Sequence, residues 1–174
     1  LVDIMGNSER ILPYVDMPLQ HINTRILKSM RRNIKRDKQY RLIERLRAID
    51  DLVLRTSFIA GYPGEPDAEF QELYDWVAEV EFDRGGVFTY SPEEGTRAGV
   101  MDGQLPEHVK HERRGALMAL QQEISERKSA QWVGEHTDVI VDGISEQHEL
   151  VFEGRHYGQA PDIAGVVYLS FDHG

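Results

Sequence analysis

The segment Leu52-Val-Leu-Arg-Thr-Ser-Phe-Ile-Ala60, followed by Gly61-Tyr-Pro-Gly64, decides the fold of this chain. The apolar and β-branched residues of the first part predict a strand, and the glycine and proline residues that follow predict its end. Beyond this turn, apolar side chains recur at the spacing of an amphipathic helix, at positions 70, 73, 74, 77 and 80. A strand that leads directly into such a helix indicates a parallel βαβ arrangement.

The same alternation extends on both sides of this segment. Ile11–Met17 predicts a strand, and helices are expected over 23–32 and 36–49. After the amphipathic helix, Gly86–Tyr90 predicts a third short strand. Three parallel strands leave two unpaired edges, so the sequence predicts an α/β unit that is part of a larger sheet or barrel.

The C-terminal part of the chain has a different pattern. A long helix is expected from Pro106 to about Trp132, with Gly134 as its end. Beyond it, short apolar runs separated by turn residues predict a small antiparallel β unit, with strands over 137–142, 150–152 and 166–169. We therefore expect two domains, over residues 1–133 and 134–174.

Composition excludes several classes of function. The 174 residues include no cysteine, which excludes disulfides, thiolate catalysis and cysteine-ligated metal centres within this stretch. Hydrophobic and charged contents of 40% and 29% are typical of a globular protein, not a disordered one. No apolar run approaches the ~20 residues of a membrane span and no signal peptide opens the chain, so we expect neither membrane insertion nor secretion. His108 and His111 are better explained by a solvated helix than by a metal site.

Charge is distributed unevenly around a net charge of −10. Residues 25–47 contain ten Lys or Arg against Asp37 and Glu44, a net charge of +8. This basic window either binds a polyanion such as RNA or forms the outer faces of two amphipathic helices, and the sequence favours neither. From Gly134 onward, Arg155 is the one basic residue against eight carboxylates, a net charge of −7. The β unit is thus expected to repel RNA and to suit a basic protein partner.

Three loops follow the carboxyl ends of the predicted parallel strands. They contain Pro18–His21, Gly61–Glu65 and Phe88–Pro92. In parallel sheets these ends meet at one edge, where ligands bind, and glycine there permits a close approach to the backbone. We therefore expect a cleft for a small polar molecule, with Arg55 in either a structural ion pair or contact with a ligand carboxylate. The residues brought to this edge are Gln20, His21, Arg55, Gly61 and Tyr90.

Motifs at these same positions resemble the radical SAM methylthiotransferases. The β unit is similar to the start of a TRAM domain, through Gly154-Arg-His-Tyr-Gly-Gln-Ala-Pro-Asp-Ile163 and Gly165-Val-Val-Tyr-Leu169. The resemblance covers nearly the whole chain. It implies an α/β fold: the second half of a radical SAM (β/α) barrel, followed by an incomplete antiparallel β domain of the TRAM, OB-like type. The barrel motifs are Tyr14-Val-Asp-Met-Pro-Leu-Gln-His21, Met30-Arg-Arg32, Leu54-Arg-Thr-Ser-Phe-Ile-Ala-Gly-Tyr-Pro-Gly-Glu65, Phe82-Asp-Arg-Gly-Gly-Val-Phe-Thr-Tyr-Ser-Pro-Glu-Glu-Gly-Thr96 and Leu120-Gln-Gln-Glu-Ile-Ser125.

The resemblance implies S-adenosylmethionine (SAM) as cofactor, and two 4Fe–4S clusters in the intact parent protein. The family's C-x-x-x-C-x-x-C loop and upstream cysteines are absent from this sequence, which implies a fragment that is inactive alone. The family's G-x-I-x-G-x-x-E motif matches in part, with Ser57 at its first position and Glu65 one residue late. No catalytic residue or metal ligand is assigned. The residues that the resemblance assigns to SAM are Gln20, Arg55, Ile59, Gly61, Phe88 and Tyr90.

Within this family, Arg55-Thr-Ser-Phe58 resembles the branch that adds a methylthio group to the β-carbon of an aspartate in a small-subunit ribosomal protein. The resemblance therefore implies a cytoplasmic transferase whose partner is that basic protein, and the acidic β unit agrees with it. Two alternatives stay open. A MiaB-like enzyme would modify a tRNA adenosine, and a non-catalytic module would bind RNA or the ribosome through Arg25–Arg47.

Overall fold

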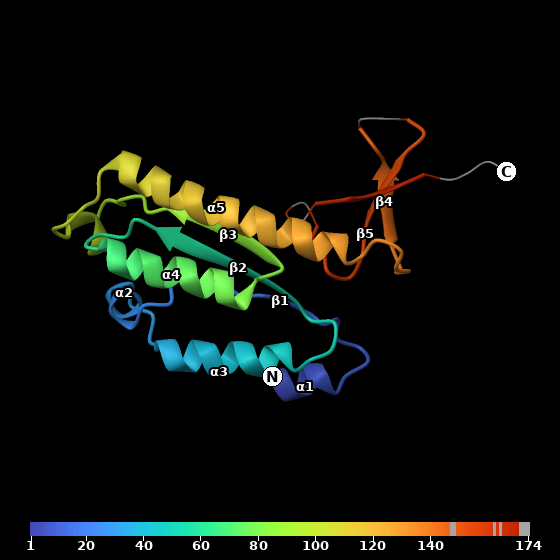
Figure 1. Ribbon diagram of the computed structural model, residues 1–174, viewed down its shortest axis with the longest axis horizontal. Helices are drawn as coiled ribbons and strands as arrows, with labels where there is room; N and C mark the ends of the chain where they lie inside the picture. Colours follow the sequence, from blue (N-terminus) through green and yellow to red (C-terminus); the bar gives the residue numbers. More distant parts are fainter. Residues whose placement is uncertain (147–148, 162, 164, 171–174) are drawn as a thin grey trace.

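The computed structural model describes residues 1–146, 149–161, 163 and 165–170 (Figure 1). Among these residues, no helix is both long enough and apolar enough to cross a membrane. The elements in chain order are α1 (Val2–Gly6), β1 (Tyr14–Asp16), α2 (Thr24–Ser29), α3 (Arg36–Arg47), β2 (Val53–Ala60), α4 (Asp67–Val80), β3 (Arg84–Thr89), the 3-10 helix η1 (Ala98–Val100), α5 (Glu107–Ala130), β4 (Ile140–Ile144), β5 (Phe152–Arg155) and β6 (Val167–Leu169).

The first three strands form one parallel sheet in the order β1-β2-β3. Helices α2 and α3 connect β1 to β2, and α4 connects β2 to β3. Asp16 of β1 lies in register with Arg55 of β2, which lies in register with Arg84 of β3. This topology confirms the predicted parallel α/β arrangement.

One face of this sheet is covered by helices and the other is open. Along β2, Leu54, Thr56, Phe58 and Ala60 are buried, whereas the alternate residues are half-buried. Successive side chains of a strand point to opposite faces, and the buried set packs in the core with side chains of α4 and α5. Asp16, Arg55 and Arg84, which lie side by side on the three strands, are therefore on the open face.

Aromatic rings form the centre of the core on the covered face. Phe58 of β2, Trp76 of α4 and Phe82, which precedes β3, pack edge to face with ring centroids 5.3–6.1 Å apart. Each is at most 1% exposed, and burial of one such ring contributes about 1.5–3 kcal/mol. This packing fixes α4 on the sheet and so positions the loop between β2 and α4.

The strands β4, β5 and β6 form a separate antiparallel sheet, as predicted. Residues beside this second sheet contact the loop before β2 and the segment after α5: the Tyr157 hydroxyl donates to the Asp51 carbonyl oxygen at 3.0 Å, and the Trp132 ring lies 4.7 Å from that of His156. All residues of β4 are exposed. The predicted domain 134–174 also includes residues 147, 148, 162, 164 and 171–174, which lie outside the described residues.

Several element ends differ from the sequence prediction. The sequence does not predict α1, and β1 begins at Tyr14 rather than Ile11, because Pro13 has no amide hydrogen for the ladder. Helix α2 ends at Ser29, shortly before Arg31 adopts a left-handed φ of +58°. In the C-terminal sheet, β4 covers Ile140–Ile144 rather than 137–142, because these are the residues that pair with β5.

Candidate binding site at the carboxyl ends of the parallel strands

A cavity of about 560 Å³ lies at the carboxyl ends of β2 and β3 and beside the loop after β1. Its volume is within the ~300–1,000 Å³ range of small-molecule sites. The wall combines an aliphatic residue, two tyrosines, an amide and three guanidinium groups. Its lining includes Gln20, Met30, Arg31, Arg32, Ile59, Tyr62, Tyr90 and Arg97.

Tyr62 and Tyr90 form the aromatic wall, with ring centroids 5.3 Å apart and an interplanar angle of 72°. The Tyr62 hydroxyl accepts a hydrogen bond from Ser29 Oγ at 3.4 Å. The buried Tyr90 hydroxyl has no hydrogen-bond partner within the described parts of the chain. Burial raises the pKa of Tyr90, so this hydroxyl is protonated at neutral pH. An unpartnered hydroxyl in a cavity wall is a donor that a ligand can use.

Gln20 stands at the edge of the cavity because β2 holds its backbone. Its φ of +70° lies in the left-handed region, which non-glycine residues rarely adopt. Its amide donates to the Ser57 carbonyl at 2.9 Å, and its carbonyl accepts from the Ile59 amide at 2.9 Å. These two hydrogen bonds offset the backbone strain and place Gln20 beside Ile59 in the cavity wall.

His21 and Glu65 are fully buried and lie next to each other. Glu65 Oε2 accepts hydrogen bonds from the amides of Gly61 at 2.5 Å and Tyr62 at 3.0 Å, which closes the turn after β2. Glu65 Oε1 lies 3.6 Å from His21 Nε2. On the other side, Arg113 of α5 donates to the Glu65 carbonyl oxygen at 2.9 Å, with its guanidinium 3.5 Å from the carboxylate. The loops after β1 and β2 are thus joined in the interior.

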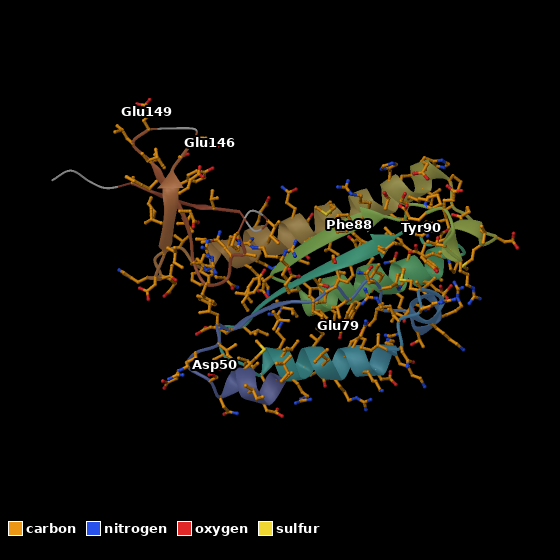
Figure 2. The ribbon with its side chains drawn as sticks, turned by 180° about the vertical axis from the view of Figure 1, so that it is seen from behind. Asp50, Glu79, Phe88, Tyr90, Glu146 and Glu149 are labelled. Carbon is orange, nitrogen blue, oxygen red and sulfur yellow. The ribbon has the colours of Figure 1, made fainter. Side chains whose placement is uncertain are left out.

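Three of the six residues predicted to bind the cofactor line this cavity, namely Gln20, Ile59 and Tyr90. Phe88 lies in register with Ile59 on the open face, where it is 63% exposed. Figure 2, seen from behind, shows Phe88 and Tyr90 toward the carboxyl end of β3. Phe88 is not among the described residues that line the cavity.

The other predicted residues lie outside the cavity wall. Arg55 is nearer the start of β2, where its guanidinium pairs with the Asp16 carboxylate. Gly61 faces α5, since a Cβ there would lie 2.5 Å from Lys110 Cγ. His21 was expected at the cleft, but its side chain is in the interior. The cofactor-binding role of Arg55 and Gly61 stays a prediction.

Sequence reasoning does not find Tyr62, Met30 or the guanidinium groups of the wall. Met30-Arg-Arg32 and the Gly61-Tyr-Pro-Gly64 turn are visible as motifs, but the directions of their side chains depend on backbone conformations that no periodicity reports. The position of Arg97 in the cavity wall depends on the path of the loop after β3, and this path has no strong sequence signal.

Four of the ten basic residues of the window form ion pairs in the structure, and two others line the cavity. Arg25, Arg36, Arg45 and Arg47 form ion pairs with carboxylates, which fits the interpretation as ordinary helix faces. Arg31 and Arg32 have no ion-pair partner in the described part of the chain, and both line the cavity together with Arg97. The cavity therefore has a cationic edge suited to an anionic group.

Comparison with known proteins finds relatives of this chain. A model described as the radical SAM superfamily matches residues 1–77, and a TRAM domain model matches residues 133–174. The ribosomal protein uS12 methylthiotransferase RimO of Bdellovibrio bacteriovorus is 47% identical over 98% of this chain and 37% of its own length. The similarity to these radical SAM methylthiotransferases extends over nearly the whole of this chain. RimO of Sorangium cellulosum is 48% identical over 98% of this chain and 35% of its own length. RimO of Aquifex aeolicus is 46% identical over 97% of this chain and 39% of its own length.

This chain spans between 35% and 39% of the length of those relatives. Among solved structures, coproporphyrinogen III oxidase (HemN) from Escherichia coli, described as a radical SAM enzyme, superposes with a TM-score of 0.53. The two share 20% sequence identity over 77% of this chain and 31% of that one. The likeness supports the radical SAM fold for the parallel unit.

The family implies SAM and iron–sulfur clusters, and the residues present fit these two groups differently. The cavity offers SAM the unpartnered Tyr90 hydroxyl, an apolar and aromatic wall and a cationic edge, so the residues fit it. A cluster needs thiolates, and the sequence has no cysteine. The described residues also contain no group of three His, Cys, Asp or Glu side chains placed to hold a metal. These residues therefore do not fit an iron–sulfur cluster.

Proposed function

We propose that these residues are part of a methylthiotransferase that modifies the β-carbon of an aspartate in ribosomal protein uS12, a small-subunit protein. The observation that supports this most strongly is the similarity to RimO proteins over 97–98% of the chain, at 46–48% identity. The segment Arg55-Thr-Ser-Phe58 supports it as well, because its sequence resembles the aspartate-modifying branch.

In this proposal the cavity at the strand ends binds SAM, and the intact enzyme would use one SAM molecule as the methyl donor and another as the source of the 5′-deoxyadenosyl radical. Ile59 and Tyr62 give an apolar surface for the adenine, and the Tyr90 hydroxyl and Gln20 amide offer hydrogen bonds. Arg31 and Arg97 would bind the cofactor carboxylate. Phe88 and Arg55 would extend this wall along the open face of the sheet. The share of these residues in catalysis is to orient the cofactor and to exclude water.

The two 4Fe–4S clusters of the intact protein would be bound by residues outside this sequence, which has no cysteine. Residues 1–174 alone would therefore be unable to cleave SAM reductively. We expect them to keep only part of the SAM affinity, because the open face of the sheet would be covered by further strands in a complete barrel.

The acidic β unit would bind the basic substrate protein. It has one basic residue against eight carboxylates from Gly134 onward, and β4 presents an exposed surface. Complementary charge accelerates and orients such encounters. With this role, residues 134–174 act as a docking domain beside the catalytic domain, and a ribosomal substrate implies a cytoplasmic enzyme.

A second candidate substrate is RNA. TRAM domains suggest RNA binding, and the cationic edge formed by Arg31, Arg32 and Arg97 would suit a phosphate backbone. This observation favours a MiaB-like tRNA methylthiotransferase, or a non-catalytic module that binds RNA or the ribosome.

The experiment that separates these functions uses the intact protein with its clusters reconstituted. It is incubated with SAM, a reductant and a sulfide source, with uS12 in one reaction and tRNA in the other, and both products are analysed by mass spectrometry. We expect a methylthio group on one aspartate of uS12 and unmodified tRNA. Modified tRNA with unmodified uS12 would favour the MiaB-like function, and salt-sensitive RNA binding without either product would favour the module.

A further inference from the structure

We propose that His21 is a positioning residue for the cavity, acting on the Tyr62 wall through Glu65. The inference rests on the proposed function, because it takes SAM as the occupant of the cavity. Gln20 and Tyr62 line the cavity from two different loops. His21 directly follows Gln20, and the Glu65 carboxylate binds the amide of Tyr62, so the contact between His21 and Glu65 joins the two walls.

Hydrogen bonding defines which nitrogen of His21 carries the proton. His21 Nδ1 accepts a hydrogen bond from the Asn23 amide at 2.9 Å, so in the neutral ring the hydrogen is on Nε2. That nitrogen lies 3.6 Å from Glu65 Oε1. Within the described residues, neither atom has a hydrogen-bond partner. The buried N–H dipole therefore faces the buried carboxylate oxygen.

This contact restrains the carboxylate in the orientation that holds the turn. Glu65 Oε2 binds the amides of Gly61 and Tyr62, while the Arg113 guanidinium, 3.5 Å away, offers a competing partner from α5. Without the N–H of His21, Oε1 loses the donor that it faces, and the carboxylate can rotate toward Arg113. A carboxylate that leaves the Tyr62 amide unpaired would allow this wall of the cavity to shift.

Two substitutions test the roles of the two imidazole nitrogen atoms separately. In His21→Gln, the side-chain amide reaches the position of Nε2 and retains a donor toward Glu65. In His21→Asn, the shorter amide reaches only the position of Nδ1 and retains the acceptor for Asn23. We expect SAM to bind about tenfold more weakly to the Asn variant and within about twofold of the wild type to the Gln variant. The measurement is calorimetric titration of the intact protein with SAM, after thermal melting has verified that both variants are folded.

Equal loss of SAM affinity in both variants, or no loss in either, would overturn the positioning role. If the Asn variant does not fold, Glu65→Gln replaces it, because its amide N–H would face the His21 N–H and the same tenfold loss is expected. Unchanged affinity in Glu65→Gln would also overturn the role. A folded, reconstituted wild type that binds no SAM contradicts the proposed cofactor site itself, and is thereby distinguished from a failure of this inference.

Discussion

Arg47 Nη1 lies 2.9 Å from Asp83 Oδ2, which ties the last turn of α3 to the residue before β3. The same carboxylate oxygen accepts from the Leu54 amide at 2.9 Å, and the other oxygen binds Lys128 Nζ at 2.7 Å. One carboxylate thus connects α3, β2 and α5 at the amino ends of the strands. This end of the sheet lies opposite the cavity, so its contacts can be tested for stability separately from ligand binding.

Replacing Asp83 by Asn should destabilise the fold. The change leaves Arg47 and Lys128 without their partner in a site where the carboxylate is only 20% exposed, and we expect a loss of about 2–4 kcal/mol in the free energy of unfolding. Urea denaturation of the intact protein measures it. The matched control is Glu81→Gln, whose ion pair with Arg127 is roughly half exposed and should contribute less than about 1 kcal/mol. Equal effects in the two variants would contradict the assignment.

The same carboxylate should make stability depend on acid pH. Burial acts to raise the pKa of Asp83, but the hydrogen bonds from Lys128 and the Leu54 amide and the charge of Arg47 outweigh it, and the pKa is lowered. A group whose pKa is lowered on folding stabilises the protein above its unfolded value of about 3.9, and this stabilisation is lost as the pH falls through the folded value. Thermal melting at a series of acid pH values should show that the melting temperatures of the wild type and Asp83→Asn converge as the pH falls. A gap that stays constant would contradict the lowered pKa.

Phe58 and Phe88 allow a matched test of the two faces of the sheet. Phe58 is 1% exposed on the covered face, and Phe88 is 63% exposed on the open face of the adjacent strand. Phe58→Ala should cost about 3–5 kcal/mol, because it leaves a cavity between Trp76 and Phe82. Phe88→Ala should cost less than about 1 kcal/mol when both variants of residues 1–174 are unfolded in urea. A comparable cost would show that the open face is packed.

Gly61 and Gly64 test how closely the turn after β2 approaches α5. Both have a left-handed φ, +79° and +71°, so alanine strains the backbone at either position by about 1 kcal/mol. At Gly61 the added Cβ would also lie 2.5 Å from Lys110 Cγ, whereas Gly64 has open space within 4 Å. We expect Gly61→Ala to lose about 1–3 kcal/mol more than Gly64→Ala in urea denaturation. Identical losses would show that Lys110 does not pack on the turn.

The parallel sheet could be predicted from the sequence because its signals are local. The strand at Leu52–Ala60, the Gly61–Gly64 turn and the helical spacing that follows are each contained in a short window. Once the strands are taken as parallel, the meeting of Gln20 and Tyr90 follows from their places at the strand ends, whereas Ile59 was assigned through the family resemblance. That part of the site required no knowledge of side-chain packing.

The rest of the site depends on contacts between distant segments. The turn of Gln20 into the left-handed region directs His21 into the interior, and a glutamine gives no sequence signal for that conformation. Arg113 reaches Glu65 from a helix far along the chain, and no periodicity predicts this pair. The division of the basic window likewise depends on which carboxylates of α4 lie beside α2 and α3.

The most direct test of the account is whether SAM occupies the cavity at the carboxyl ends of the strands. Ile59→Trp would fill that cavity, whereas Val53→Trp places the same ring on the same face of β2, in a separate cavity of about 490 Å³ at its other end. Calorimetric titration of the intact, reconstituted protein with SAM should show at least about a tenfold loss of affinity for Ile59→Trp and wild-type affinity for Val53→Trp. Wild-type affinity in Ile59→Trp would contradict the account.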